Sequence, residues 1–355
     1  MQLDPKILKT DERVAYALRS IYRKFGYMRF KMSRFEEYAL YIKNKDFLVS
    51  DGIISFTDTN GRLLALKPDV TLSIINNSNN SVAETQKLYY DENVYRISKS
   101  SKSYKEIRQT GVECIGNVGL LEICEVSMLA IKSLKSISDS FVFELSHIGL
   151  LEAVLEQYNI SDNLKTIISL ITSKNLDELK KLELDEEALK AICVFVKNFS
   201  CFDDAVVELE SICYSRAAVE ALDEFKAILK FVLDMGYAEN CKVDFSLAND
   251  MSYYSGIVFR GYIKQVPVGV LSGGQYDKLM RKMGKNSGAI GFAVYLDALE
   301  RYNMEEMQYD VDTVLLHKDD ICATLKRAEE LSKDGKSVRV LSKIPDGLRY
   351  REFIE

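Results

Sequence analysis

Hydrophobic positions near the start of the chain follow first a helical and then a strand-like pattern. Between residues 10 and 26 the apolar side chains Val14, Leu18, Ile21, Tyr22 and Phe25 recur at helical spacing. Thr10 or Asp11 is a suitable N-cap and Gly26 a suitable end, which predicts a helix. Residues 27–37 then read as extended. Farther along, two short apolar runs flank Asn60-Gly61, which predicts a hairpin over residues 53–66.

Strand and helix patterns then alternate up to residue 157. Pro68 ends the hairpin, and a helix is expected to begin near Asp69 or Thr71. Residues 88–97 and 110–115 read as strands, 120–135 as a helix, 140–146 as a strand and 149–157 as a helix. Basic residues recur at every third position between the first two strands, which predicts a positively charged, flexible loop. They are Arg96, Lys99, Lys102, Lys105 and Arg108.

The second half of the chain has a different texture. Residues 158–241 contain no proline and are rich in Leu, Lys, Glu and Asp, which predicts a helical insertion. A strand is expected at 243–245, a tyrosine-rich segment with a Gly-Gly turn at 249–277, and a strand entering a helix at 286–301. Residues 311–341 read as a short strand–helix–strand unit.

Hairpins separated by helices define an α+β fold built on an antiparallel sheet flanked by helices. We expect four segments along the chain. Residues 1–157 form the first part of a core, 158–241 a helical insertion subdomain, 242–305 the second part of the core, and 306–355 a short C-terminal unit.

Bulk composition excludes several classes of protein. The net charge of −6 argues against a nucleic-acid binder that relies on phosphate attraction. The seven cysteines form no CxxC pair and there are only two histidines, so we expect no metal site. No apolar run approaches the roughly 18 residues of a membrane span. An odd cysteine count and the lack of a signal-peptide pattern favour the reducing cytoplasm.

Five segments, taken in order, carry a family resemblance. They are LALKPDVT (64–71), VYRISKSSKSYKEIRQTGVE (94–113), SYYSGIVF (252–259), GGQYD (273–277) and GAIGFAVYLDALER (288–301). Together they resemble the catalytic core of histidyl-tRNA synthetase, a class II aminoacyl-tRNA synthetase fold. The similarity extends over about residues 10–300.

This resemblance implies a pocket that binds L-histidine. The implied lining residues are Asp69, Thr71, Gln109, Glu113, Tyr253, Tyr254 and Tyr276. Asp69 and Thr71 would hold the amino group, with Asp in place of the usual Glu. Carboxylates suit an ammonium group, and hydroxyls with an amide suit an imidazole. Simpler structural interpretations stay open: Asp69 and Thr71 as helix caps, the tyrosines as packing residues, and His147 as a structural histidine.

Departures from the synthetase pattern fall on ATP chemistry. Activation of an amino acid develops negative charge at phosphate, which requires fixed cations. Arg96 keeps the position of the motif-2 arginine, but two other arginine positions hold Asn249 and Ala298. Further departures are Ser33, Ser98 and Gln275. The pattern predicts a chain that binds histidine and does not activate it.

An intact histidine pocket without ATP chemistry resembles the regulatory subunit of ATP phosphoribosyltransferase, in the first step of histidine biosynthesis. The resemblance implies no catalysis by the chain alone, no cofactor, a short-form catalytic subunit as partner, feedback inhibition by histidine and a homodimer within a hetero-oligomer. Beyond Met307 the chain resembles only the opening of an anticodon-binding domain, so no tRNA binding is expected. The basic segment 96–108 contacts either solvent, or an anion or the partner. The alternatives are a histidyl-tRNA synthetase-like adenylate-forming enzyme and a histidine-sensing protein.

Overall fold

The computed structural model describes residues 8–48, 52–78, 84–97, 102–160, 164–250, 253–299, 309–333 and 335–355, with the backbone alone at 249–250. The chain divides into two compact units, Met1–Tyr302 and Asn303–Glu355. Among the described residues, the first unit contains two sheets and the second unit one.

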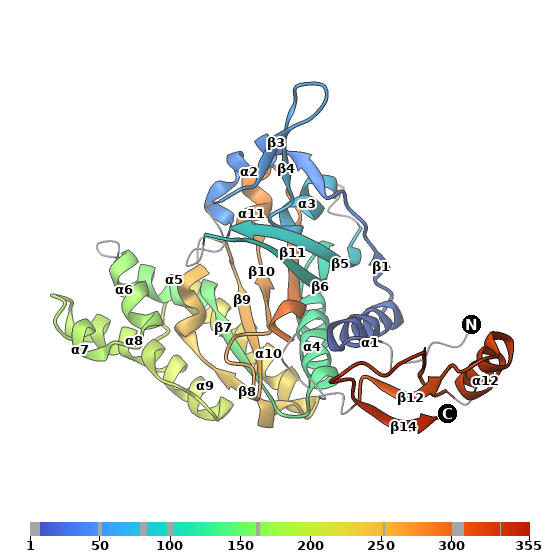
Figure 1. Cartoon of the computed structure of the whole chain (residues 1–355). Helices are drawn as coiled ribbons and strands as arrows, with labels where there is room; N and C mark the ends of the chain where they lie inside the picture. Colours follow the sequence, from blue (N-terminus) through green and yellow to red (C-terminus); the bar gives the residue numbers. More distant parts are fainter. Residues whose placement is uncertain are drawn as a thin grey trace. The chain divides into compact units, whose positions relative to one another are not determined.

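An eight-stranded sheet forms the centre of the first unit (Figure 1). Its order is β1-β5-β6-β11-β10-β9-β7-β8. Pairing is antiparallel from β5 to β7, and the two edge pairs, β1 with β5 and β7 with β8, are parallel. The bounds are β1 Met28–Arg29, β5 Gln86–Ile97, β6 Tyr104–Gly116, β7 Phe141–His147, β8 Cys241–Val243, β9 Ile257–Ile263, β10 Leu271–Gln275 and β11 Gly288–Tyr295.

Two hydrophobic clusters cover the two faces of this sheet. The larger cluster contains side chains of α1 (Thr10–Lys24), α4 (Leu120–Ile137) and α5 (Ile148–Gln157). The smaller one contains side chains of α2 (Tyr38–Lys43), η2 (Lys45–Phe47), α3 (Val70–Asn77) and α11 (Asp277–Lys282). Neighbouring strand residues divide between the faces, as Cys114 of the larger cluster and Ile115 of the smaller one show.

A three-stranded antiparallel sheet lies next to α3, with the order β2-β4-β3 (Figure 1). Its strands are β2 Phe35–Glu37, β3 Ser55–Thr57 and β4 Leu63–Leu66. The hairpin expected around Asn60-Gly61 is confirmed, because β3 pairs with β4 and Gly61 has a φ of +80°. Asp58 accepts hydrogen bonds from the backbone of Asn60 and Arg62 and so fixes the turn.

Between residues 164 and 240 the structure has helices joined by turns and short loops, with one isolated bridge at Phe199. The helices α6 to α9 lie together beyond the β7–β8 side of the sheet (Figure 1). The bounds are α6 Leu164–Thr172, α7 Leu176–Leu179, α8 Glu186–Val196, α9 Phe202–Glu210, α10 Arg216–Asp234 and η3 Ala238–Asn240. Among the described residues, no helix is both long and apolar enough to cross a membrane.

The second unit is a parallel three-stranded sheet with one helix. Its order is β13-β12-β14, with β12 Val311–Leu316, α12 Ile321–Lys333, β13 Val338–Leu341 and β14 Tyr350–Ile354. The strand–helix–strand expectation is confirmed for the first three elements. The additional strand β14 was not expected from the sequence.

The basic loop is the main correction to the expected elements. Arg96 lies in β5, and Lys105 and Arg108 lie in β6. The two strands remain paired as far as Ile97 and Tyr104. Lys99 lies outside the described residues. The charged residues predicted a loop, but a strand forms because cross-strand partners neutralise them. For example, Arg108 on β6 donates hydrogen bonds to Asp91 on β5.

Three smaller corrections concern element ends. The first helix is capped by Lys9 and not by Thr10 or Asp11. After β11 the chain forms a short 3-10 turn, η5 (Leu296–Leu299), where a helix was expected. The strand expected at 243–245 ends at Val243, and the turn η4 (Phe245–Asp250) follows it.

Candidate functional site

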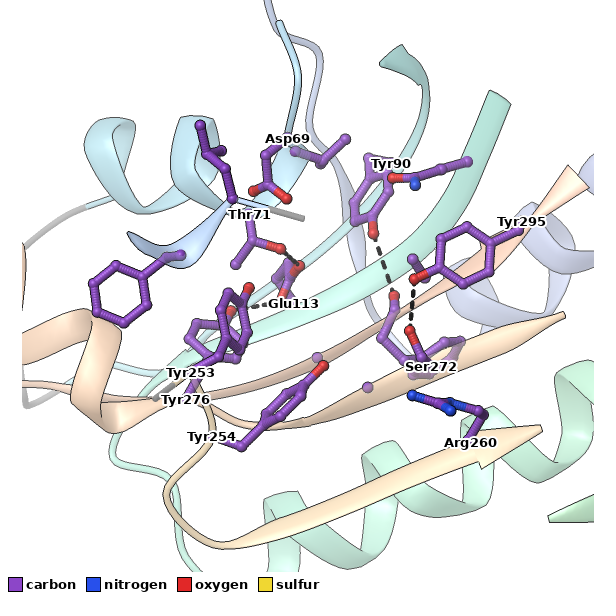
Figure 2. A pocket seen from close by; sticks show the side chains of 18 of the residues that line it. Asp69, Thr71, Tyr90, Glu113, Tyr253, Tyr254, Arg260, Ser272, Tyr276 and Tyr295 are labelled. Atoms are coloured by element: carbon purple, nitrogen blue, oxygen red, sulfur yellow. Dashed lines mark hydrogen bonds between the residues drawn. The ribbon is translucent and has the colours of Figure 1, made fainter. Parts of the chain in front are cut away.

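A cavity of about 470 Å³ opens on the face of the sheet that carries the smaller cluster (Figure 2). This volume falls within the range of about 300–1,000 Å³ that is usual for small-molecule sites. Its lining comes from β5, β6, β9, β10 and β11, from the start of α3 and from residues 46–48 and 253–254. Segments far apart in the sequence therefore meet at one site.

Small residues create the space over the sheet. Side chains of alternate strand residues share a face, so Glu113 and Gln109 of β6 point to the cavity side, with Gly111 between them. Opposite them in register lie Gly291, Ala293 and Tyr295 of β11. A Cβ at Gly291 would overlap the Glu113 carboxylate. The glycine therefore lets the acid lie flat against the neighbouring strand.

Glu113 is the buried acid at the centre of the site. Its side chain accepts a hydrogen bond from the Thr71 hydroxyl at 2.9 Å and a second one from the Tyr276 hydroxyl. The pKa of Glu113 is raised to about 8, chiefly by burial; the hydrogen bonds from Tyr276 and Thr71 oppose the shift, and the nearby Asp69 contributes a smaller increase. The carboxyl is therefore positioned to respond to a cationic ligand.

Asp69 both caps a helix and lines the cavity. As the N-cap of α3 it accepts a hydrogen bond from the Leu72 N–H at 2.9 Å, so the capping interpretation is confirmed. Its other oxygen lies 3.9 Å from the Arg96 guanidinium. Burial raises the pKa of Asp69, and the charge of Arg96 opposes this shift. The same carboxyl lines the cavity, so capping does not exclude contact with a ligand.

Three tyrosines form an aromatic wall. The rings of Tyr253 and Tyr254 lie 4.8 Å apart, and those of Tyr253 and Tyr276 lie 5.9 Å apart. Burial raises the pKa of Tyr276 well above its ordinary value, so its hydroxyl remains a donor. Gly274, at φ +159°, leaves room for the Tyr254 ring, because a Cβ there would lie 2.8 Å from it.

The opposite end of the cavity was missed by the sequence reasoning. Tyr295 and Ser272 share a hydrogen bond of 2.6 Å, and the Tyr90 hydroxyl donates to the Phe292 carbonyl at 3.3 Å. Arg260 of β9 lies on the Ser272 side, away from Asp69 and Thr71 (Figure 2). The alternation of side-chain direction along β9 and β10 could have placed Arg260 and Ser272 on the cavity face, but only if the order of the strands in the sheet had been known.

The structure brings the seven implied histidine-site residues to this one cavity, together with Arg96. Lys102, Lys105 and Arg108 are absent from its described lining, and Arg108 is paired with Asp91 and Asp11. His147 is structural, since its Nδ1 accepts the Leu150 N–H as the cap of α5.

Asn249 and Ala298 occupy the two positions at which the synthetase pattern has arginine. Ala298 lies in η5, packed against the larger cluster. The side chain of Asn249 lies outside the described part of the structure. Within the described residues, no group of His, Cys, Asp or Glu forms a metal-binding cluster.

This arrangement suits a small ligand that carries both charges. The buried Glu113 carboxyl and the half-buried Asp69 carboxyl can hold a cationic group. Hydroxyls of Thr71 and Tyr276 add hydrogen bonds, and arginines on the lining can hold an anion. An antiparallel sheet with such a pocket on one face is the core of a class II aminoacyl-tRNA synthetase fold.

The sequence matches the family model described as histidyl-tRNA synthetase over residues 1–299, and the chain belongs to this family. Within it, the chain is 28% identical over 343 residues to an ATP phosphoribosyltransferase regulatory subunit of Clostridium botulinum (strain 657 / Type Ba4), covering 92% of this chain and 80% of the relative. A protein of the same name from Clostridium kluyveri is 27% identical, with 92% and 88% covered. The resemblance expected from the motifs is thus confirmed.

Solved structures support the fold. The structure of an ATP phosphoribosyltransferase regulatory subunit/histidyl-tRNA synthetase from Bacillus halodurans matches with a TM-score of 0.81 at 23% identity, covering 100% of this chain and 96% of that one. A chain of the ATP phosphoribosyl transferase (HisG:HisZ) complex from Thermotoga maritima matches with a TM-score of 0.63 at 20% identity, covering 81% and 97%. The class II synthetase-like fold is confirmed.

Proposed function

We propose that this chain is the regulatory subunit of an ATP phosphoribosyltransferase and that its cavity binds L-histidine as the feedback inhibitor. The observation that carries the proposal is the cavity itself. Asp69, Thr71 and Glu113 meet the tyrosine wall there, although they come from three separate segments of the chain.

The binding mode follows from the chemistry of the walls. The Asp69 carboxyl and the Thr71 hydroxyl lie at the start of α3 and receive the ammonium group of histidine. Glu113, with Tyr276 beside it, faces the imidazole, and the aromatic wall excludes water. Gln109 adds an amide on the floor.

Lack of catalysis by the chain alone is part of the proposal. Adenylation needs several cations around the α-phosphate. The described cavity lining offers only Arg96 and Arg260, and Arg96 already pairs with Asp69. Ala298 supplies no cation.

The proposed partner is a short-form ATP phosphoribosyltransferase catalytic subunit, with this chain as a homodimer inside a hetero-oligomer that does not bind tRNA. The name of the Thermotoga maritima complex supports the pairing, since it joins two different subunits. Lys102 and Lys105 are exposed and can contact the partner or an anion. We assign no such role to Arg108, because its guanidinium is held by two carboxylates. We also propose that the chain has four segments, with a helical insertion at residues 158–241 between the two parts of the core.

Co-purification with the catalytic subunit, followed by assays of ATP phosphoribosyltransferase activity, tests the proposal. We expect activity that requires both chains and that L-histidine inhibits. The Tyr276→Phe variant removes one donor to Glu113 and should weaken inhibition while leaving activity without histidine unchanged. The matched control Tyr104→Phe alters an exposed tyrosine and should leave inhibition as in the wild type. Absence of histidine binding by the chain, alone and in the complex, contradicts the proposal.

A second candidate is a histidyl-tRNA synthetase-like adenylate-forming enzyme, favoured by the family to which the chain belongs. This candidate predicts histidine-dependent exchange of pyrophosphate into ATP by the purified chain. We expect no exchange above background, and clear exchange would replace our proposal.

A further inference from the structure

One side of the cavity comes from a short turn at the surface. Asp46, Phe47 and Leu48 lie on the lining, within or directly after η2. Asp46 is exposed, whereas the Phe47 ring is buried and lies 6.2 Å from the Tyr253 ring at an interplanar angle of 64°. Phe47 therefore adds a fourth ring to the aromatic wall of tyrosines.

The backbone hydrogen bonds of this turn join it to the end of α2. The Phe47 N–H donates to the Asn44 carbonyl at 3.1 Å, and the Leu48 N–H donates to the Lys45 carbonyl at 3.1 Å. A second hollow, of about 490 Å³, is lined by residues of α2 and α3 and by the end of α11. Close packing is therefore incomplete between α2 and α11, and a side chain that joins them can fix the position of the turn.

Lys282, the last residue of α11, joins this helix to the turn in two ways. Its Nζ lies 2.9 Å from the Asp46 carboxylate and 4.4 Å from the centroid of the Phe47 ring. An exposed ion pair alone stabilises little, because water screens it. A cation over an aromatic face adds a second attraction, which acts on the ring itself. Together the two contacts restrain both Asp46 and Phe47.

The same helix reaches the centre of the cavity at its other end. Tyr276 occupies the N-cap position of α11 and donates a hydrogen bond to Glu113 (Figure 2). Lys282 lies at the C-terminal end of the helix and contacts Phe47. One short helix therefore supports the central acid and the Phe47 side of the aromatic wall.

We propose that Lys282 is a positioning residue that holds Phe47 against Tyr253 and thereby slows the release of a ligand from the cavity. Lys282 is absent from the described lining, so it acts through Asp46 and Phe47. The inference rests on the proposed histidine binding and identifies a residue that sets how long histidine stays bound. A lysine at a helix C-terminus can also stabilise the helix alone, but that role predicts a change in stability and none in release.

Release of radiolabelled L-histidine into an excess of unlabelled histidine tests the inference. Lys282→Met removes the charge and should accelerate release about three- to tenfold, with the urea midpoint of unfolding close to that of the wild type. Asp46→Asn removes the ion pair alone and should accelerate release about twofold. Lys282→Arg can form both contacts and should release histidine as slowly as the wild type.

Lys278→Met is the matched control on the same helix. Lys278 forms an ion pair with Glu152 of α5, and neither residue belongs to the described lining of the cavity. Equal release rates for Lys278→Met and Lys282→Met, or fast release from Lys282→Arg, would overturn the inference. A lower unfolding midpoint of Lys282→Met with release at the wild-type rate would assign Lys282 to helix stability alone and would also overturn it.

The outcomes separate this inference from the function on which it rests. If the wild-type chain binds no histidine, the proposed function fails and the inference falls with it. If the wild-type chain binds histidine and Lys282→Met releases it at the same rate, the function stands and the role of Lys282 is rejected.

Discussion

Glu113 is an ionisable side chain held in the interior of the first unit, and its surroundings determine its charge. The Thr71 and Tyr276 hydroxyls donate to it, yet burial outweighs them and raises its pKa to about 8. With Asp69 in the same cavity, two acids share a poorly solvated site. The sequence indicated that Glu113 belonged to a pocket. The resemblance also implied Thr71 and Tyr276 in the same pocket, but not their hydrogen bonds to Glu113, which only the folded chain shows because Tyr276 lies 163 positions away.

The pH dependence of stability follows from this pKa. The folded value of about 8 exceeds the ordinary 4.5, so the folded chain retains a proton that the unfolded chain releases. Stability should therefore fall as pH rises between 4.5 and 8, by at most about 1.4 kcal/mol per pH unit from this group. The unfolding free energy of Glu113→Gln, measured with urea, should lack this pH-dependent decrease. If the unfolding free energy of the variant changed with pH in parallel with that of the wild type, this prediction would be contradicted. Glu330→Gln, at an exposed position, serves as the control.

A second residue-scale prediction concerns Gly291. The Gly291→Ala variant adds a Cβ that would overlap the Glu113 carboxylate and lie 2.5 Å from the Val112 carbonyl oxygen. We expect destabilisation of ~1–3 kcal/mol and at least tenfold weaker histidine binding, because the carboxyl must move. Urea unfolding and calorimetry measure the two effects. Gly119→Ala is the control, since its Cβ would meet only Glu122 at 3.7 Å, and equal behaviour of the two variants would argue against the explanation.

At the scale of elements, the hairpin of β5 and β6 shows how pairing overrides composition. Its outer half is rich in charge, which predicts a loop when each residue is considered alone. In the structure Asn93 and Tyr95 both donate to Glu106 across the strands, and Arg108 bridges Asp91 to Asp11 of α1. These cross-strand and strand–helix pairs make a strand favourable for the segment. They were invisible without the register.

Arg108 is therefore expected to contribute to stability. Arg108→Met removes hydrogen bonds of 2.9 and 3.0 Å to Asp91 and of 3.0 Å to Asp11, leaving Asp91 nearly buried with Arg19 at 3.6 Å. We expect a loss of ~1–3 kcal/mol, less than for a fully buried pair because Arg108 is partly exposed. Urea unfolding provides the measurement. Arg216→Met, in an exposed helical pair, should leave the midpoint unchanged, and a similar shift in both variants would contradict the role.

At the scale of the whole molecule, the chain contains two compact units, and the cavity belongs to the first. The described members of both hydrophobic clusters end at Leu299, within that unit. Its sheet joins strands from both sides of the helical segment 164–240. Ligand binding at the cavity should therefore stabilise the unit as a whole.

A thermal scan with histidine tests this expectation. At a ligand concentration one hundred times the dissociation constant, binding adds about 2.7 kcal/mol to the unfolding free energy. The main transition of the wild-type chain should rise, and that of Glu113→Gln should rise less at the same concentration. An unchanged transition at saturating histidine would contradict binding at this cavity.

The sequence by itself determined the class of fold, the family and the residues around the end of the cavity that carries Asp69, Glu113 and Tyr276, because motif order and local patterns of apolar residues are properties of the chain. Only the tertiary structure decided that Arg108 is a strand residue, that Asp69 both caps a helix and lines the cavity, and that Arg260 and Tyr295 share this site. The physical reason is strand register: β9, β10, β11 and β6 lie side by side although long segments separate β6 from β9. The partners that set charge and space at the cavity are therefore distant in sequence and adjacent only after folding.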